Sequence, residues 1–160
     1  MGGAGDSHAT DWETADLAAS TGRRVPVRRP TGDDGRELMR RFKRGFARAD
    51  PTELGAVITD DFEWHLHHFP ADRPSPTGTV LRGLDQVMAE IRWRQEHWHG
   101  VRFNGMVERY LGDLVVQTFT VSGHDEHHRP FTVDAVDLYR IVDDRLASKD
   151  TYWKQPSTRH

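Results

Sequence analysis

A carboxylic acid in an apolar stretch is the first candidate for chemistry in this sequence. Asp137 lies in FTVDAVDLYRIV (residues 131–142), where an extended backbone places Ala135 and Tyr139 on its side of the strand. A carboxylate in such surroundings is costly unless it is paired, hydrogen-bonded or protonated. Asp137 is therefore either a structural hydrogen-bonding group or a carboxyl tuned for proton transfer in a pocket.

Two histidines are the second candidates. His65 and His67 are two residues apart in the predicted strand FEWHLHHF (62–69), so they share one side with Glu63, while Trp64 lies on the other. An unperturbed imidazole pKa of about 6.5 suits a general base. A metal would need three converging ligands, and Glu63 could supply the third. We nevertheless expect no metal, because a histidine on a strand more often bonds to core groups or substrate. We also expect no cofactor. The sequence leaves open which side of this strand faces a cavity.

The end of the chain supplies further polar and aromatic candidates. Tyr152 and Asp150 share a face of the last predicted strand, and they would neighbour Asp137 and Tyr139 if the register allows. Tyr152 is thus a candidate catalytic residue and Asp150 a candidate ligand-binding residue. The aromatic candidates for a pocket wall that would suit an aromatic or polycyclic ligand are Trp64, Trp98 and Tyr139.

Hydrophobic periodicity predicts three helices that would position these residues. The first follows from Gly35, where Leu38, Met39, Phe42 and Phe46 recur at helical spacing. A second, short helix begins at Asp50-Pro51, an N-cap residue followed by a proline at the first helical position, and residues 59–61 close it. A third begins at Gly83.

The remaining stretches predict an antiparallel sheet. Strands are expected at residues 62–69, 79–82, 101–111 and 114–123, followed by two more that pair within residues 131–154. Tight turns are expected at Gly112-Asp113 and Asp143-Asp144. Helices that precede such a meander cover only one of its faces, so the fold class is α+β. A curved antiparallel sheet wrapped on three N-terminal helices encloses a cone-shaped cavity for a small apolar ligand.

Composition sets the broad class. The 160 residues suit one domain, which we place at residues 35–155, after a flexible leader (1–34) and before a frayed tail (156–160). A net charge of −3 gives no electrostatic reason to expect nucleic acid or an anionic membrane as partner. The absence of cysteine excludes disulfides and thiolate nucleophiles. No apolar run is long enough to span a membrane and no signal peptide is evident, so we expect a cytoplasmic protein.

Three strings, in this order, resemble the NTF2-like superfamily, particularly its SnoaL-like and ketosteroid-isomerase-like branch. They are FARADPTELGAVITDDFEWH (46–65), VLRGLDQVMAEI (80–91) and VDAVDLYRIVDDRLASKDTYWK (133–154). The resemblance covers residues 36–154 and implies a cone-shaped α+β fold with a small-molecule cavity.

The resemblance also implies roles for single residues. Asp137 matches the aspartate that ketosteroid isomerases keep protonated as an oxyanion donor and that SnoaL-type polyketide cyclases use as acid–base catalyst. Phe42 falls where the isomerases place their oxyanion-hole tyrosine, which makes it a candidate ligand-binding residue. The general-base aspartate of the isomerases falls near Leu66, between His65 and His67. True ketosteroid isomerase activity is therefore not expected.

Two kinds of function fit these residues. The first is a cofactor-independent enzyme of isomerase, cyclase, dehydratase or hydrolase type that acts on a small hydrophobic molecule, with Asp137 as acid and His65 or His67 as base. The second is a non-catalytic module that binds a ligand in the same cone or a protein partner on its sheet. In either case we expect a homodimer, because the apolar side of the strand opposite Asp137 would be left uncovered by the helices.

Overall fold

The computed structural model describes residues 32–155, which form three helices and one six-stranded sheet. The helices are α1 (Gly32–Arg48), α2 (Pro51–Val57) and α3 (Gly83–His97). The strands are β1 (Ile58–His65), β2 (Val80–Arg82), β3 (His99–Leu111), β4 (Leu114–His124), β5 (Pro130–Val142) and β6 (Arg145–Trp153). The predicted leader and tail lie outside the described residues, except that α1 already begins at Gly32 and so includes the last three residues assigned to the leader.

The three helices form where hydrophobic periodicity places them. Helix α1 buries Leu38, Met39 and Phe42. Helix α2 is capped as expected, because the Asp50 carboxylate accepts hydrogen bonds from the backbone N–H groups of Thr52 (2.9 Å) and Glu53 (3.1 Å). These contacts satisfy N–H groups that the first turn of a helix leaves without partners.

The first strand differs from its prediction at both ends. Residues 59–61 do not close α2; β1 already begins at Ile58, which pairs with Leu146 of β6, and it ends at His65 instead of Phe69. Ile58, and after an irregular stretch residues 63–65, pair in parallel with β6, a long-range contact that local sequence does not indicate.

The sheet has the strand order β2-β1-β6-β5-β4-β3, and only the β1–β6 pair is parallel. The predicted meander of β3 to β6 is confirmed. Its last turn contains Asp143 (φ 49°) and Asp144 (φ 60°), the two positive φ angles that a type I′ hairpin requires.

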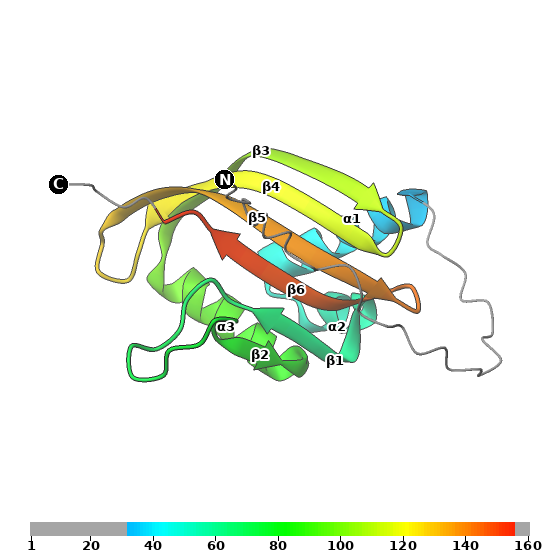
Figure 1. The fold of residues 1–160 in the computed structure, drawn as a ribbon, viewed down its shortest axis with the longest axis horizontal. Helices are drawn as coiled ribbons and strands as arrows, with labels where there is room; N and C mark the ends of the chain where they lie inside the picture. The colour runs from blue at the N-terminus through cyan, green and yellow to red at the C-terminus, as the bar shows by residue number, and fades with distance from the viewer. Residues whose placement is uncertain (1–31, 156–160) are drawn as a thin grey trace, which may run out of the picture.

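The two faces of the sheet differ in burial. Figure 1 shows the helices gathered behind the sheet, and the inner face buries Phe62, Trp64 and Tyr139. On the outer face of β5, Val136 is half-buried and Val142 is 40% exposed. The α+β prediction is therefore confirmed, with one open sheet covered on a single face. None of the helices within residues 32–155 has the length and apolar character needed to cross a membrane.

Candidate functional site

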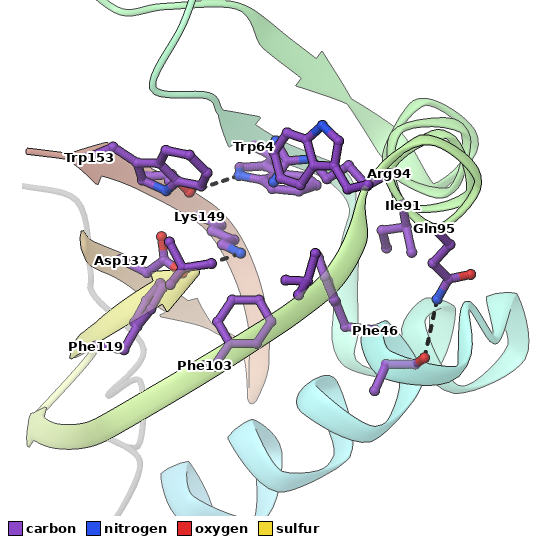
Figure 2. A pocket seen from close by; sticks show the side chains of 15 residues that line it. Phe46, Trp64, Ile91, Arg94, Gln95, Phe103, Phe119, Asp137, Lys149 and Trp153 are labelled. Carbon is purple, nitrogen blue, oxygen red and sulfur yellow. Dashed lines mark hydrogen bonds and ion pairs between the residues drawn. The ribbon is translucent and has the colours of Figure 1, made fainter. Parts of the chain in front are cut away.

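A cavity of about 500 Å³ lies between the inner face of the sheet and helices α1 and α3. Its wall is mainly apolar, and its aromatic members are Phe46, Trp64, Trp98, Phe103, Phe119 and Trp153. The charged residues of the wall are Arg94, Asp137 and Lys149. The cavity is therefore a mainly apolar pocket whose wall contains three charged residues (Figure 2).

Asp137 and Lys149 form an ion pair within this wall. Lys149 Nζ lies 3.3 Å from Asp137 Oδ2, and the two residues are only 7% and 2% exposed (Figure 2). The Tyr139 hydroxyl donates to the same carboxylate oxygen over 3.3 Å. Asp137 Oδ1 is buried and has no hydrogen-bond partner among the described residues. The carboxylate therefore has one oxygen near two donors, Lys149 and a Tyr139 hydroxyl that also lies 3.3 Å from Gln117 Oε1, and one buried oxygen without a partner among the described residues.

Aromatic rings surround the Lys149 ammonium. Its Nζ lies 4.5 Å from the centre of the Trp64 ring, 4.8 Å from that of Phe46 and 5.7 Å from that of Tyr139. Burial lowers the pKa of Lys149, Asp137 opposes this effect, and the nearby cation Arg94 adds to it. Burial, reinforced by Asp137, also raises the pKa of Tyr139 well above its ordinary value, so its hydroxyl stays a donor.

Arg94 is the second cation of the cavity. Its guanidinium lies 4.6 Å from the centre of the Trp98 ring and 4.8 Å from that of Trp64. Its Nε donates to Glu90 Oε1 over 2.6 Å, and its Nη2 is buried without a partner among residues 32–155. Burial lowers the pKa of Arg94, while Glu90 opposes that change. Arg94 thus has one unused donor in a wall that otherwise offers a ligand few hydrogen bonds.

The register of β6 corrects the expected neighbourhood of Tyr152 and Asp150. Asp137 pairs with Thr151, and Tyr139 pairs with Lys149, so the residues that share the Asp137 face are Lys149 and Thr151. Tyr152 is 52% exposed on the opposite face and donates to Asp150 Oδ2 over 2.9 Å. The pair cannot join Asp137, because neighbouring residues of a strand point to opposite faces.

The two candidate histidines do not line the cavity either. His65 Nε2 bonds to Glu63 Oε2 at 3.1 Å, in a smaller hollow of about 220 Å³ that also includes His67. The His67 ring stacks on Trp153, with 3.7 Å between ring centres. Burial, with smaller contributions from nearby cationic groups, lowers the pKa of His67 to about 3. Neither imidazole therefore reaches Asp137 as a partner base. Among residues 32–155, no three His, Asp or Glu side chains gather as a metal site would require.

The remaining candidates divide between cavity and core. Trp64 and Trp98 line the cavity, and the Trp64 indole N–H donates to the Thr151 hydroxyl over 2.9 Å. Tyr139 lies beneath the cavity as a partner of Asp137. Phe42 belongs to the core, where its ring meets Tyr139 edge-on at 5.5 Å, and it is not part of the cavity wall.

Sequence reasoning missed Lys149 and Arg94. Arg94 could have been identified from the sequence, since it lies three residues after Ile91, at a spacing that places both side chains on one face of the helix. Lys149 could not be identified as a cavity residue from the sequence, because a regular two-residue hairpin after Val142 would place it on the outer face of the sheet. The structure instead has a register shift, in which Ile141 pairs with Leu146 and Arg140 with Ser148.

Comparisons with known proteins identify the family and the fold of the chain. The model of a family described as SnoaL-like domain matches residues 39–149. An NTF2-like protein from Burkholderia xenovorans LB400 superposes with a TM-score of 0.65 at 18% identity, over 78% of this chain and 92% of that chain. A candidate polyketide cyclase from Xanthomonas campestris pv. campestris gives a TM-score of 0.61 at 14% identity, over 76% and 91% of the two chains.

TsrD from Streptomyces laurentii is similar too, with a TM-score of 0.57 at 21% identity, over 78% of this chain and 90% of that chain. A search of curated protein sequences found no match. At these identities the structural likeness shows the fold.

Proposed function

Because the chain belongs to the SnoaL-like domain family, we propose that it is a cofactor-independent enzyme that transfers a proton through Asp137 to or from a small hydrophobic molecule. The observation that carries this proposal is the Asp137–Lys149 ion pair in the wall of an aromatic cavity. A charged pair in such a place costs desolvation energy that a purely apolar pocket would avoid. A role in chemistry accounts for that cost.

The cavity favours a ligand with an apolar body and a polar oxygen. Its volume of about 500 Å³ is within the range of small-molecule sites. The rings of Trp98, Phe103 and Phe119 would cover flat or polycyclic apolar surface, and Lys149 or Arg94 would take an oxygen.

The proposed reaction class is proton transfer next to a carbonyl group. Asp137 Oδ1, which has no hydrogen-bond partner among residues 32–155, would take the proton from the carbon beside the carbonyl. The Lys149 ammonium would stabilise the negative charge that develops on the carbonyl oxygen, as an oxyanion donor does. The Tyr139 hydroxyl would hold the carboxylate in place through the other oxygen. Isomerisation, cyclisation and dehydration all contain such a step. Asp137 thus takes the base role that the sequence assigned to His65 or His67. Lys149 takes the oxyanion-donor role that the resemblance assigned to Asp137.

A second candidate function is binding without turnover. The observation in its favour is that Lys149 and Tyr139 both stabilise the Asp137 carboxylate, as they would in a structural ion pair. Neither candidate histidine, His65 or His67, lines the cavity, which also favours binding without turnover. In this case the protein would carry or sense a hydrophobic molecule.

Hydrogen–deuterium exchange separates the two functions without knowledge of the natural substrate. The bicyclic ketone 2-tetralone would be incubated with the protein in D₂O, and loss of its α-proton signals followed by NMR against buffer alone. We expect faster exchange with the wild type and at least about a hundred-fold smaller protein-dependent rate with Asp137→Asn. Asp134→Asn is the matched control, since Asp134 lies on the same strand and its carboxylate accepts a hydrogen bond from the Thr120 hydroxyl (2.8 Å) in the exposed part of the sheet.

The possible outcomes of this experiment distinguish the two functions. A rise in melting temperature with 2-tetralone but no exchange would favour the binding function. Neither binding nor exchange would mean that hydrophobic ketones are not the ligand class. Equal rates of α-proton exchange with the wild type and with Asp137→Asn would show that Asp137 does not take part in the proton transfer.

A further inference from the structure

Lysine is rare in this chain, and one lysine lies in the cavity. Lys43, Lys149 and Lys154 are the three lysines among 22 basic residues. Lys43 lies at the surface of α1 and pairs with Glu108 Oε1 at 2.6 Å, and Lys154 is exposed after β6. An arginine opposite Asp137 would form a stronger, two-pronged ion pair but could not lose its proton. A lysine in this position can lose its proton and act as a neutral amine.

We propose that Lys149 is an amine nucleophile that forms an imine with an aldehyde or ketone bound in the cavity. This inference rests on the proposed function and narrows its substrate class from carbonyl compounds in general to hydrophobic aldehydes and ketones. Lysines that react in this way lie in apolar pockets or beside another cation, and Lys149 has both an aromatic surround and Arg94 nearby.

The ion pair provides a route to the neutral amine. When a ligand fills the cavity and displaces water, moving one proton from Lys149 to Asp137 converts two buried charges into two neutral groups. The distance of 3.3 Å between Lys149 Nζ and Asp137 Oδ2 is short enough for that transfer. The lowered pKa of Lys149, caused by burial and Arg94, favours the same direction.

The covalent step balances with these two groups alone. The lone pair of Lys149 Nζ attacks the carbonyl carbon, and proton transfer from nitrogen to oxygen gives a carbinolamine. The Asp137 carboxylic acid then protonates the carbinolamine hydroxyl, which leaves as water as the C=N bond forms. The products are a protonated imine on Lys149, one water molecule and the Asp137 carboxylate, so charge is conserved and no oxidant or reductant is needed.

The surroundings of Lys149 suit the product as well as the free residue. A protonated imine has its positive charge at nearly the same place as the ammonium. The rings of Phe46 and Trp64 and the Asp137 carboxylate, which stabilise the ammonium, therefore also stabilise the imine. The imine in turn acidifies the neighbouring C–H bond, whose proton Asp137 would take.

Reductive trapping tests the inference. The full chain would be incubated with 2-tetralone and sodium borohydride, and the mass of one reduced tetralyl group located by peptide mapping. We expect the adduct on Lys149, with the exposed Lys154 and the partly exposed Lys43 as internal controls for unselective reaction. Asp137→Asn should slow trapping by about a hundred-fold, because the general acid is lost. Lys149→Met, checked for folding by circular dichroism, should give no cavity adduct.

The outcomes separate this inference from the proposed function. If Lys149 carries no adduct, or no more than Lys154, while 2-tetralone still exchanges its α-protons, the imine is wrong and the proton-transfer function stands. Unchanged α-proton exchange in Lys149→Met would also overturn the imine. If both trapping and exchange are absent in the wild type, both proposals fall.

Discussion

Lys149 and Asp137 face each other across the neighbouring strands β6 and β5, with 3.3 Å between Nζ and Oδ2 and almost no exposure of either residue. Each charge is compensated mainly by the other. The intact pair therefore adds little net stability to the fold, but removing one member leaves the other as an uncompensated buried charge. This relationship leads to the first prediction.

Loss of one member of the pair should cost more than loss of both. Asp137→Leu leaves a buried ammonium without its counter-ion, and we expect a loss of about 3–5 kcal/mol in the free energy of unfolding. The double variant Asp137→Leu/Lys149→Met should recover most of that loss. Urea denaturation of the two variants measures the difference, and a single variant as stable as the wild type would contradict the buried pair.

Acid should destabilise the protein through His67. Its pKa is about 3 in the folded protein, against an ordinary value of about 6.5, so the folded state stays neutral while the unfolded state takes up a proton. Stability is therefore fully present above pH 6.5 and falls as the pH drops toward 3, by at most about 1.4 kcal/mol per pH unit.

The variant His67→Phe should flatten this dependence. Phenylalanine keeps the ring that stacks on Trp153 but cannot be protonated. Denaturation between about pH 7 and pH 4 gives the slope for each protein. His127→Gln, in the exposed loop between β4 and β5, is the control and should keep the wild-type slope. If the free energy of unfolding changes with pH equally in the wild type and in His67→Phe, His67 is not the group that titrates.

Gly78 should tolerate no side chain. It has a φ of +71°, and a Cβ there would collide with the Leu66 carbonyl group in the loop that joins β1 and β2. Gly105 is the matched control, with a φ of +61° but open space around its Cβ position. We expect Gly105→Ala to cost about 1 kcal/mol, from the left-handed backbone alone. Gly78→Ala should cost at least about twice as much, because it adds a steric clash. Equal melting temperatures for the two variants would contradict this packing.

The outer face of the sheet is where we expect a second copy of the chain to bind. Val136 lies at its centre, paired with Thr118 on one side and Tyr152 on the other, and Val107 beyond them is 45% exposed. Light scattering should give a dimer mass for the wild type. Val136→Glu should shift it toward monomer, because a charge would be buried in the interface. Leu111→Glu at the β3–β4 turn is the control, and a monomeric wild type would refute the expectation.

Local sequence determined much of this fold. The spacing of Leu38, Met39 and Phe42 was sufficient for α1, and Asp50 was sufficient for the start of α2, because both signals act within one or two helical turns. Alternation within β5 placed Asp137 and Tyr139 on one buried side, since the side-chain period of a strand is fixed at two. The order of these elements, together with the strings at residues 46–65, 80–91 and 133–154, indicated the family.

Tertiary structure decided which polar groups meet Asp137. The parallel pairing of β1 with β6 brings Trp64 beside Lys149, across a long stretch of chain that no local signal bridges. The extra residue in β6, Ala147, shifts its register against β5 by one position. That shift turns Lys149 and Thr151 toward the cavity and Asp150 and Tyr152 away from it, because a slip of one residue moves every later side chain of a strand to the other face.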